Sequence, residues 1–494
     1  MKAEGFKDPR SPSLQELIQF LDNADHRSGL VYLRGRRRVG KSTVLQSFSQ
    51  QKKYNLFYFS GVLDETNQQT RLRFAKAWAD YSGNNLIQKI KLKELTWDFI
   101  WKDITTAAES KKVNLVFDEI QWIAKGQSGF IGTLKNYWLN LEPTQNCRII
   151  ICGSSNKFFK TYTGGEEQIL RGIKTHSDII LPPFSLSEVH KQYGQKLKPE
   201  QTSLLYMILG GIPYYWNQLY FDLSFIQLLN KAFAIKNNIF LEEVDEVLRL
   251  EFNQAGLKTI KKILRTISLK GNTLDSIQSK SKLATGTLVD SINKLCEYNI
   301  LLEESSVYGK QLEIKRGSKF FMKDFYLNFY FSLIKPNETK IRRNEESLLI
   351  NELFKWPTSF YYIEGFSGEA FENLIEYTLQ SSYHRNQKIF NLLRLKNVDF
   401  EIGKYWSKDN QIDLVIHNCS DQQDRWIECK WTNSIDLIRQ QALSLINKKK
   451  LFISNKNSKS LPKLFLAIPI VASKELIKFC KDLDVTIIEI TDLL

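Results

Sequence analysis

The chain has 494 residues, which is too long for one compact hydrophobic core, so we expect two to four domains. Hydrophobic residues make up 43% of the chain and charged residues 25%, as in ordinary soluble globular proteins. The formal net charge of +15 favours a polyanionic partner, above all nucleic acid, although a basic surface can also serve solubility alone. Six cysteines without a CxxC pair argue against a zinc site and a disulfide framework. The polar start and the lack of a long apolar run predict a cytoplasmic protein without a membrane partner.

The first 185 residues alternate between helical patterns and apolar strands. Helices are predicted over residues 13–22, 67–80, 97–110 and 128–141, and strands over residues 30–33, 54–60, 113–119, 147–155 and 176–185. This alternation indicates a parallel sheet that helices cover on both faces.

Residues 30–48 contain a phosphate-loop motif, and the other predicted elements are arranged around it. The segment GRRRVGKS, from Gly35 to Ser42, fits the phosphate-loop pattern G-x-x-x-x-G-K-[ST] between an apolar strand and a helix. Its glycines permit a tight turn that wraps backbone N–H groups around a polyphosphate at the start of a helix. Lys41 is expected to reach the β- and γ-phosphates of ATP, and the Ser42 hydroxyl to hold Mg²⁺. The predicted nucleotide-binding residues of this loop are Gly35, Arg36, Arg37, Arg38, Val39, Gly40, Lys41, Ser42 and Thr43.

Polar residues end two of the later strands. In VNLVFDE, Asp118 is expected to bind Mg²⁺ and Glu119 to activate the attacking water. The strand CRIIICGSS ends in Ser154 and Ser155, either of which could sense the γ-phosphate, although a plain turn explains two serines equally well. Ser154 and Asp118 are counted among the predicted nucleotide-binding residues. Arg171 is a candidate arginine finger, although lone arginines are usually solvated.

The order of these motifs carries a resemblance to a known family. GRRRVGKS, VFDEIQWI, IICGSS, LPPFSLSEV and LGGIPYYW follow one another as in the prokaryotic AAA-type ATPases of the STAND group, and the chain resembles their archaeal-ATPase family with a C-terminal nuclease-like domain. The resemblance implies an ATPase core over residues 1–194 and a helical lid over residues 195–255. In that family the GG-[IV]-P segment belongs to the lid, and Gly211 and Pro213 match it here.

Residues 256–334 are predicted to form a winged helix, because three amphipathic helices are followed by the strand pair LLEES and QLEIKR. A DNA reader of this kind would place its third helix, near residues 285–294, in the major groove. The exposed face of that helix is poor in Arg, Asn and Gln, and in the resembling family such a module often serves intramolecular regulation. The aromatic-rich segment 320–334 is expected to be packed core. A linker is predicted over residues 335–360, with the polar run 335–347 as its best candidate.

Residues 361–494 contain two alternating strands around a polar loop, which indicates a hairpin. Asp413 on one strand can share a face with Glu428 and Lys430 on the other, because side chains alternate along a strand. Glu372, on a preceding amphipathic helix, adds a third acid. This is the arrangement of the PD-(D/E)XK fold, in which Asp413 and Glu428 would ligate Mg²⁺ while Lys430 orients or deprotonates water. A solvated acidic helix face and a chance ExK match are the alternatives.

The predicted fold is therefore α/β: a P-loop AAA-type parallel sheet with a helical lid, a winged-helix domain and a C-terminal α/β restriction-endonuclease-like domain. The predicted catalytic residues are Glu119, Arg171, Glu372, Asp413, Glu428 and Lys430, and the predicted metal ligands are Ser42, Asp118, Asp413 and Glu428. We expect ATP and Mg²⁺ as cofactors and nucleic acid as partner, DNA rather than RNA, with a homo-oligomer among the candidate assemblies. The alternative is a regulatory switch in which ATP holds a closed state and the C-terminal fold only binds nucleic acid or protein.

Overall fold

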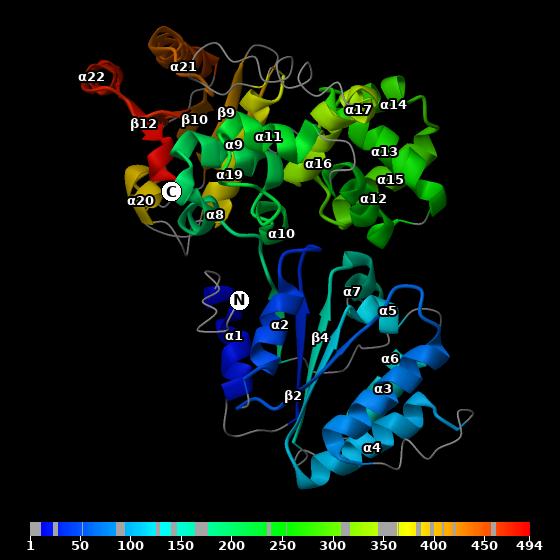
Figure 1. Cartoon of the computed structure of the whole chain (residues 1–494). Helices are drawn as coiled ribbons and strands as arrows, with labels where there is room; N and C mark the ends of the chain where they lie inside the picture. Colours follow the sequence, from blue (N-terminus) through cyan, green and yellow to red (C-terminus); the bar gives the residue numbers. More distant parts are fainter. Residues whose placement is uncertain are drawn as a thin grey trace. The chain divides into compact units, whose positions relative to one another are not determined.

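A computed structural model provides the three-dimensional structure of the chain (Figure 1). It describes residues 11–22, 28–51, 53–84, 94–124, 129–139, 146–163, 176–234, 239–252, 254–307, 317–343, 363, 365–381, 387–395, 400–407, 410–417, 421–455 and 461–494. The chain divides into two compact units. Unit 1 is Met1–Pro183 with Ile212–Tyr214, and unit 2 is Phe184–Gly211 with Tyr215–Leu494.

Unit 1 is built on a five-stranded parallel sheet with the strand order β2-β3-β4-β1-β5. The strands are β1 (Gly29–Arg34), β2 (Leu56–Ser60), β3 (Val113–Asp118), β4 (Cys147–Gly153) and β5 (Ser177–Ile180). β4 pairs with β1 on one side and with β3 on the other, so the carboxyl ends of these three strands are neighbours. Ligands of open parallel sheets bind at this edge, and the phosphate loop, the acidic end of β3 and the serine pair after β4 all lie there.

Helices cover both faces of this sheet, as the alternation predicted (Figure 1). The helices described in unit 1 are α1 (Ser11–Asp22), α2 (Lys41–Ser49), α3 (Asn67–Ser82), α4 (Trp97–Ser110), α5 (Ile120–Ile123), α6 (Phe130–Leu139) and α7 (Asn156–Thr163). Alternate strand residues such as Tyr32, Phe59 and Phe117 form one aromatic core with Trp78 of α3 and Trp101 of α4. α1 and α2 lie on the opposite face of the sheet (Figure 1).

Residues 184–343 of unit 2 are mostly helical. Their α-helices, the first residues of α10 belonging to unit 1, are α8 (Leu186–Tyr193), α9 (Pro199–Leu209), α10 (Pro213–Trp216), α11 (Phe225–Leu229), α12 (Ile239–Glu251), α13 (Gln254–Ser268), α14 (Leu274–Ser281), α15 (Thr285–Glu297), α16 (Phe325–Phe329) and α17 (Lys335–Arg342). α8 belongs to unit 2. Ser185 begins α8 with a capping box, and the Phe184 N–H, directly after the proline pair, donates to the Gly211 carbonyl at 2.8 Å.

The order of three helices and a strand pair predicted for residues 256–334 is present. β6 (Leu301–Glu304) pairs with β7 (Lys319–Met322), and the predicted strand QLEIKR lies outside the described residues. The polar run predicted as a linker begins with the helix α17. Pro336 is compatible with a first helical turn, and α17 buries Ile341. The aromatic segment before α17 is buried, as predicted.

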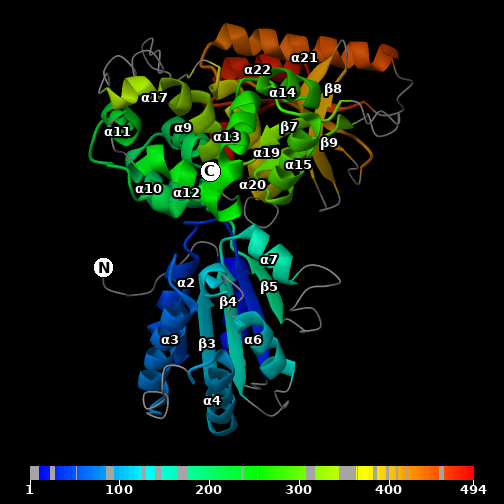
Figure 2. The same cartoon turned by 90° about the vertical axis from the view of Figure 1, so that its right-hand side faces the viewer.

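The C-terminal part of unit 2 contains a second five-stranded sheet, with the order β12-β11-β10-β9-β8. Its elements are α19 (Ser367–Ser381), α20 (Gln387–Leu392), β8 (Glu401–Trp406), β9 (Gln411–His417), β10 (Arg425–Cys429), α21 (Ile435–Asn455), β11 (Lys463–Ile468), α22 (Lys474–Asp482) and β12 (Val485–Glu489). β8, β9 and β10 are antiparallel neighbours, whereas β11 and β12 run parallel to β10. Figure 2 shows α21 and α22 on one side of this sheet, where Ile438 and Leu445 pack on Trp426 and Leu466.

α19 packs against β9 and β10. The pairing predicted around the polar loop is present, because β9 and β10 are antiparallel neighbours within the mixed sheet. Within the described ranges, no helix is long and apolar enough to cross a membrane.

Candidate functional site

The phosphate loop joins β1 to α2 through backbone geometry that only glycine adopts without strain. A Cβ atom at Gly35 would lie 2.5 Å from the Leu181 carbonyl oxygen, which is closer than any real contact. Gly40 precedes α2 with a left-handed φ of 98°. These two positions explain why the sequence pattern requires glycine at each end of the loop.

Lys41 and Ser42 begin α2 at the edge where β1 ends. Lys41 is only 4% exposed, and its Nζ donates to the carbonyl oxygens of Gly35 at 2.8 Å and Arg36 at 3.0 Å. Burial lowers the pKa of Lys41, and the nearby acids Glu119 and Asp118 oppose that shift. The ammonium group therefore lies under the loop, beside the acidic end of β3, where the motif predicted it.

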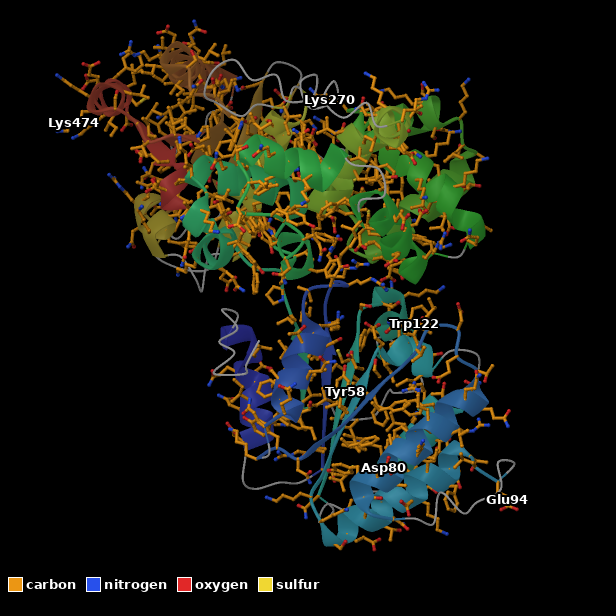
Figure 3. The ribbon with its side chains drawn as sticks, in the orientation of Figure 1. Tyr58, Asp80, Glu94, Trp122, Lys270 and Lys474 are labelled. Atoms are coloured by element: carbon orange, nitrogen blue, oxygen red, sulfur yellow. The ribbon has the colours of Figure 1, made fainter. Side chains whose placement is uncertain are left out.

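Asp118 ends β3 and is held on both carboxylate oxygens. The Tyr58 hydroxyl donates to Oδ2 at 2.5 Å, and the Glu119 N–H donates to Oδ1 at 2.9 Å. Tyr58 lies on the neighbouring strand β2 (Figure 3). Burial and the Asp118 charge raise the pKa of Tyr58, so it remains a hydrogen-bond donor. Tyr58 was not predicted as a site residue, because its only signal in the sequence is a polar atom within an otherwise apolar strand.

The two serines after β4 have different partners. The Ser155 hydroxyl accepts a hydrogen bond from the Phe158 N–H at 3.1 Å and so satisfies the first turn of α7. The Ser154 hydroxyl instead accepts a hydrogen bond from Gln121 at 3.4 Å, and Gln121 also donates to the Glu119 carboxylate. Ser154 is thus the serine that lies toward the predicted catalytic acid. Arg171, the candidate arginine finger, lies outside the described residues.

Tyr214, directly after the GG-I-P segment, contacts an arginine of the phosphate loop. The guanidinium carbon of Arg38 lies 4.0 Å from the centre of the Tyr214 ring, which is a cation–π contact within unit 1. A Cβ at Gly211 would lie 1.8 Å from the Phe184 carbonyl oxygen, so the backbones pass too close for any other residue. The close approach of the two backbones explains why glycine occupies position 211. Tyr214 was not predicted as a site residue from the sequence.

The three predicted acids of the C-terminal sheet come from three elements and influence one another. Asp413 lies on β9, and its Oδ2 accepts a hydrogen bond from the Cys429 N–H of β10 at 2.9 Å. Burial and the Asp413 carboxylate raise the pKa of Glu372, on α19, to about 8. The same two causes raise the pKa of Glu428, on β10, to about 7. Glu372 is half-buried, with 22% of its side chain exposed, so its helix face is not fully solvated.

Three further side chains complete this acidic site, and none of them was predicted. From α21, Lys448 Nζ donates to Glu428 Oε1 at 2.6 Å and Gln441 Nε2 donates to Glu428 Oε2 at 2.7 Å. From β8, the buried Lys404 lies 3.4 Å from Glu372 Oε2. Burial alone would lower the pKa of Lys404, but the surrounding carboxylates, Glu372 foremost, raise it to about 12.

Lys430 lies apart from these buried cations. β10 ends at Cys429, and the exposed Lys430 follows it, with its N–H donating to the Ala467 carbonyl at 2.9 Å. Lys430 nevertheless interacts electrostatically with Asp413. Burial raises the pKa of Asp413, and several groups, including the positive charge of Lys430, oppose that rise. In the described part of the chain, no three His, Cys, Asp or Glu side chains are arranged to hold a metal ion. The arrangement is thus a set of buried acids balanced by lysines.

These pKa shifts predict that unit 2 loses stability as pH rises. A carboxyl group whose pKa rises on folding stabilises the protein below its ordinary pKa, and that contribution is lost as pH passes its folded pKa. For Glu372 the window runs from the ordinary value of 4.5 to about 8. Calorimetry of the intact chain at pH 5 and pH 8.5 should show a smaller fall of Tm for Glu372→Gln than for wild type.

Glu475→Gln is the matched control for this experiment, because Glu475 is an exposed acid of the same unit. It should follow the wild-type curve. Identical pH dependence for wild type and Glu372→Gln would mean that Glu372 is ionised freely and that the buried acids do not interact.

Two family models match separate parts of the chain. Residues 9–219 match a family of ATPase domains found predominantly in Archaea, and residues 330–446 match a family of archaeal and bacterial proteins of unknown function. An uncharacterised protein of Methanocaldococcus jannaschii is 24% identical over 428 residues, which cover 86% of this chain and 88% of that protein.

The chain is similar to several solved structures, but with low sequence identities and low TM-scores. A Walker-type ATPase of Pyrococcus abyssi has a TM-score of 0.47 and 16% identity, covering 65% of this chain and 95% of that one. A STAND protein with a tetratricopeptide repeat sensor from Pyrococcus horikoshii has a TM-score of 0.30 and 15% identity, covering 80% of this chain and 50% of that one. At these scores the likenesses carry no argument of their own. The match of residues 9–219 to a family of ATPase domains and the phosphate-loop geometry both support an ATPase domain in the N-terminal part of the chain.

Proposed function

We propose that unit 1 hydrolyses ATP with Mg²⁺ and that the C-terminal mixed sheet is a Mg²⁺-dependent nuclease, which acts on DNA rather than RNA. The observation that carries the nuclease proposal is the convergence of Glu372, Asp413 and Glu428 from a helix and two strands. Partly and fully buried carboxylates repel one another, and a bound cation relieves that repulsion. A protein that only bound nucleic acid would gain nothing from acids that repel phosphate.

The ATPase chemistry follows from the edge of the parallel sheet. Lys41 binds the β- and γ-phosphates, while Ser42 and Asp118 are the groups that would hold Mg²⁺. Asp118 fits this role, because its fixed carboxylate retains acceptor capacity beyond the hydrogen bonds from Tyr58 and the Glu119 N–H. Mg²⁺ supplies charge neutralisation at the phosphate oxygens when it is bound. Glu119 takes the proton of the attacking water, with Ser154 close to the γ-phosphate.

The nuclease chemistry uses the acids of the mixed sheet. Asp413 and Glu428 would hold the divalent cation, and their oxygen donors suit Mg²⁺. Burial and the Asp413 carboxylate raise the pKa of Glu372 to about 8 even with Lys404 beside it, so a bound cation would favour release of the Glu372 proton. The exposed ammonium of Lys430 can reach a phosphodiester, which the buried Lys404 cannot.

A regulatory switch is the second candidate function, and one observation favours it. Both carboxylate oxygens of Glu428 already accept hydrogen bonds, from Lys448 and Gln441. A domain that had lost cleavage and only bound nucleic acid or protein could keep its acids neutralised in this way. In that case ATP binding would control a binding surface instead of a cleavage site.

A cleavage assay distinguishes the two functions. Single- and double-stranded DNA and RNA are incubated with the intact protein, with and without Mg²⁺ and ATP, and phosphate release is followed in parallel. The proposal expects Mg²⁺-dependent cleavage of DNA together with ATP hydrolysis. Hydrolysis of ATP without cleavage of any substrate favours the switch.

The net charge predicts salt-dependent binding to nucleic acid. Each lysine or arginine that neutralises a phosphate releases a counterion, so affinity should fall steeply with salt. Lys280 and Lys282, near the third helix of the three-helix segment, are exposed. Replacing both with alanine should reduce the slope of log K against log salt by about 1–2.

The control is the pair Lys474→Ala and Lys478→Ala, which removes the same charge from the exposed face of α22. Lys474 is labelled in Figure 3. This pair should leave the slope nearly unchanged. Equal slopes for all three proteins would mean that the three-helix segment makes no phosphate contacts.

A further inference from the structure

Gln121 follows Glu119 by two residues and contacts two groups of the proposed ATPase mechanism. On α5, its side-chain Nε2 donates to the Glu119 carboxylate and, at 3.4 Å, to the Ser154 hydroxyl. One amide nitrogen therefore connects the acid after β3 with the serine after β4. These are neighbouring strands, and their ends form part of the candidate nucleotide site.

The direction of the Gln121 amide is set by Glu119. A carboxylate only accepts hydrogen bonds, so the amide nitrogen must face it. The amide oxygen is enclosed and accepts no hydrogen bond from the residues that the structure describes. An enclosed acceptor without a donor is unfavourable, so the side chain is held here through its N–H groups.

Gly153 leaves the space that this amide occupies. A Cβ at Gly153 would lie 2.8 Å from the Gln121 amide oxygen and 3.0 Å from Ile120 Cγ2. Gly153 is the last residue of β4, directly before Ser154. A side chain at this position would push the amide away from Glu119.

The backbone of Glu119 is constrained as well. Its φ of 48° and ψ of 47° are left-handed, which is uncommon for a residue with a side chain. The Glu119 N–H donates to Asp118 Oδ1, and its carbonyl accepts a hydrogen bond from the Trp122 N–H, each at 2.9 Å. Strained backbone of this kind is concentrated at functional sites. Both ends of Glu119 are thus fixed, the backbone by Asp118 and Trp122 and the carboxylate by Gln121.

We infer that Gln121 is a positioning residue for ATP hydrolysis, which orients the Glu119 carboxylate and couples that orientation to Ser154. This inference rests on the proposed ATPase function. A general base must lie within hydrogen-bond reach of the proton that it takes, so a carboxylate free to rotate loses rate. Nucleotide affinity depends on the phosphate loop and should not change with Gln121.

Replacing Gln121 with methionine tests the inference, because methionine has similar length but no N–H group. We expect kcat to fall by about 10–100-fold while the Kd for ATP changes by less than about threefold. Gln51→Met is the matched control, because the exposed Gln51 lies beyond the end of α2, and it should keep the wild-type kcat. Gly153→Ala should also lower kcat, because it displaces the same amide while keeping Gln121. Thermal unfolding confirms that each variant is folded.

A double-mutant cycle separates positioning from a purely structural role. If Gln121 acts through Glu119, then adding Gln121→Met to Glu119→Asp, which keeps a weaker, shorter base, should cause a smaller loss of kcat than Gln121→Met causes in the wild type. The losses from Gln121→Met and Ser154→Ala should likewise be less than additive. A full wild-type kcat in Gln121→Met, or losses that add, overturns the inference and leaves the ATPase proposal intact. If the wild-type protein binds ATP without hydrolysing it, both the inference about Gln121 and the ATPase proposal are wrong.

Discussion

Replacing Lys41 with alanine should abolish ATP binding and hydrolysis. In the structure Lys41 is the buried cation beneath the phosphate loop, next to Asp118 and Glu119. A charge-assisted contact of this kind contributes roughly 3 kcal/mol, so the Kd for ATP should rise about 100-fold or more. Equilibrium binding of a fluorescent ATP analogue and phosphate release measure the two effects.

Two comparisons make this result specific. Lys53→Ala removes an exposed lysine of the same unit, which pairs with Asp22, and should leave binding unchanged. Glu119→Gln should keep ATP affinity but lose hydrolysis, because the amide cannot take a proton from water. If Lys41→Ala binds ATP as tightly as Lys53→Ala does, the nucleotide lies elsewhere. Phosphate release that persists in Glu119→Gln would show that another group activates the water.

The ATPase half could be predicted because its chemistry is local in sequence. The glycines, Lys41 and Ser42 lie within one loop, and an apolar strand before them indicates how the loop is held. Asp118 and Glu119 follow a strand whose neighbours in the sheet are expected for a parallel α/β fold. The sequence pattern alone does not distinguish Ser154 from Ser155, because the difference depends on which hydroxyl the first turn of α7 uses.

The acidic site could be predicted only in part. The alternation of β10 and a hairpin turn were enough to bring Asp413 near Glu428. Lys448 and Gln441 are separated from Glu428 by a loop and part of α21, so their contact depends on how that helix packs on the sheet. Polar and charged residues on a long helix are usually solvated, and nothing local marks Lys448 and Gln441 as different.

The mistaken linker has a related cause. Polar composition was taken to indicate an unfolded connection, but a helix needs only one buried face, and Ile341 supplies a buried residue within α17. The preceding segment is helical and buried, so its continuation costs less than starting a new helix would. Amino-acid composition alone does not show which residues of a polar segment are buried by the elements around it.

Replacing Asp413 with asparagine should remove both metal binding and nucleic-acid cleavage. Asparagine can still accept the Cys429 N–H through its amide oxygen, so β9 and β10 should remain paired. The change removes one charge from the set that includes Glu372 and Glu428, and a divalent cation then loses a ligand. We expect the affinity for Mn²⁺, measured by calorimetry on the nucleotide-free intact chain, to fall about 10–100-fold. ATP hydrolysis should stay at the wild-type rate, because its residues lie in unit 1.

Lys430→Ala is the informative partner of Asp413→Asn. Lys430 is exposed and touches no carboxylate of the set closely enough to form an ion pair among the described residues, so its loss should leave Mn²⁺ affinity nearly intact. Cleavage should nevertheless fall, by about 100-fold or more, because the ammonium acts at the scissile phosphate and the attacking water. Lys448→Ala should behave differently and release Glu428, which changes metal affinity first. Cleavage that survives Asp413→Asn, or a wild-type chain that binds no Mn²⁺ without nucleotide, would refute the nuclease proposal. The buried acids would then serve the regulatory switch, with Lys404 and Lys448 as their permanent counter-charges.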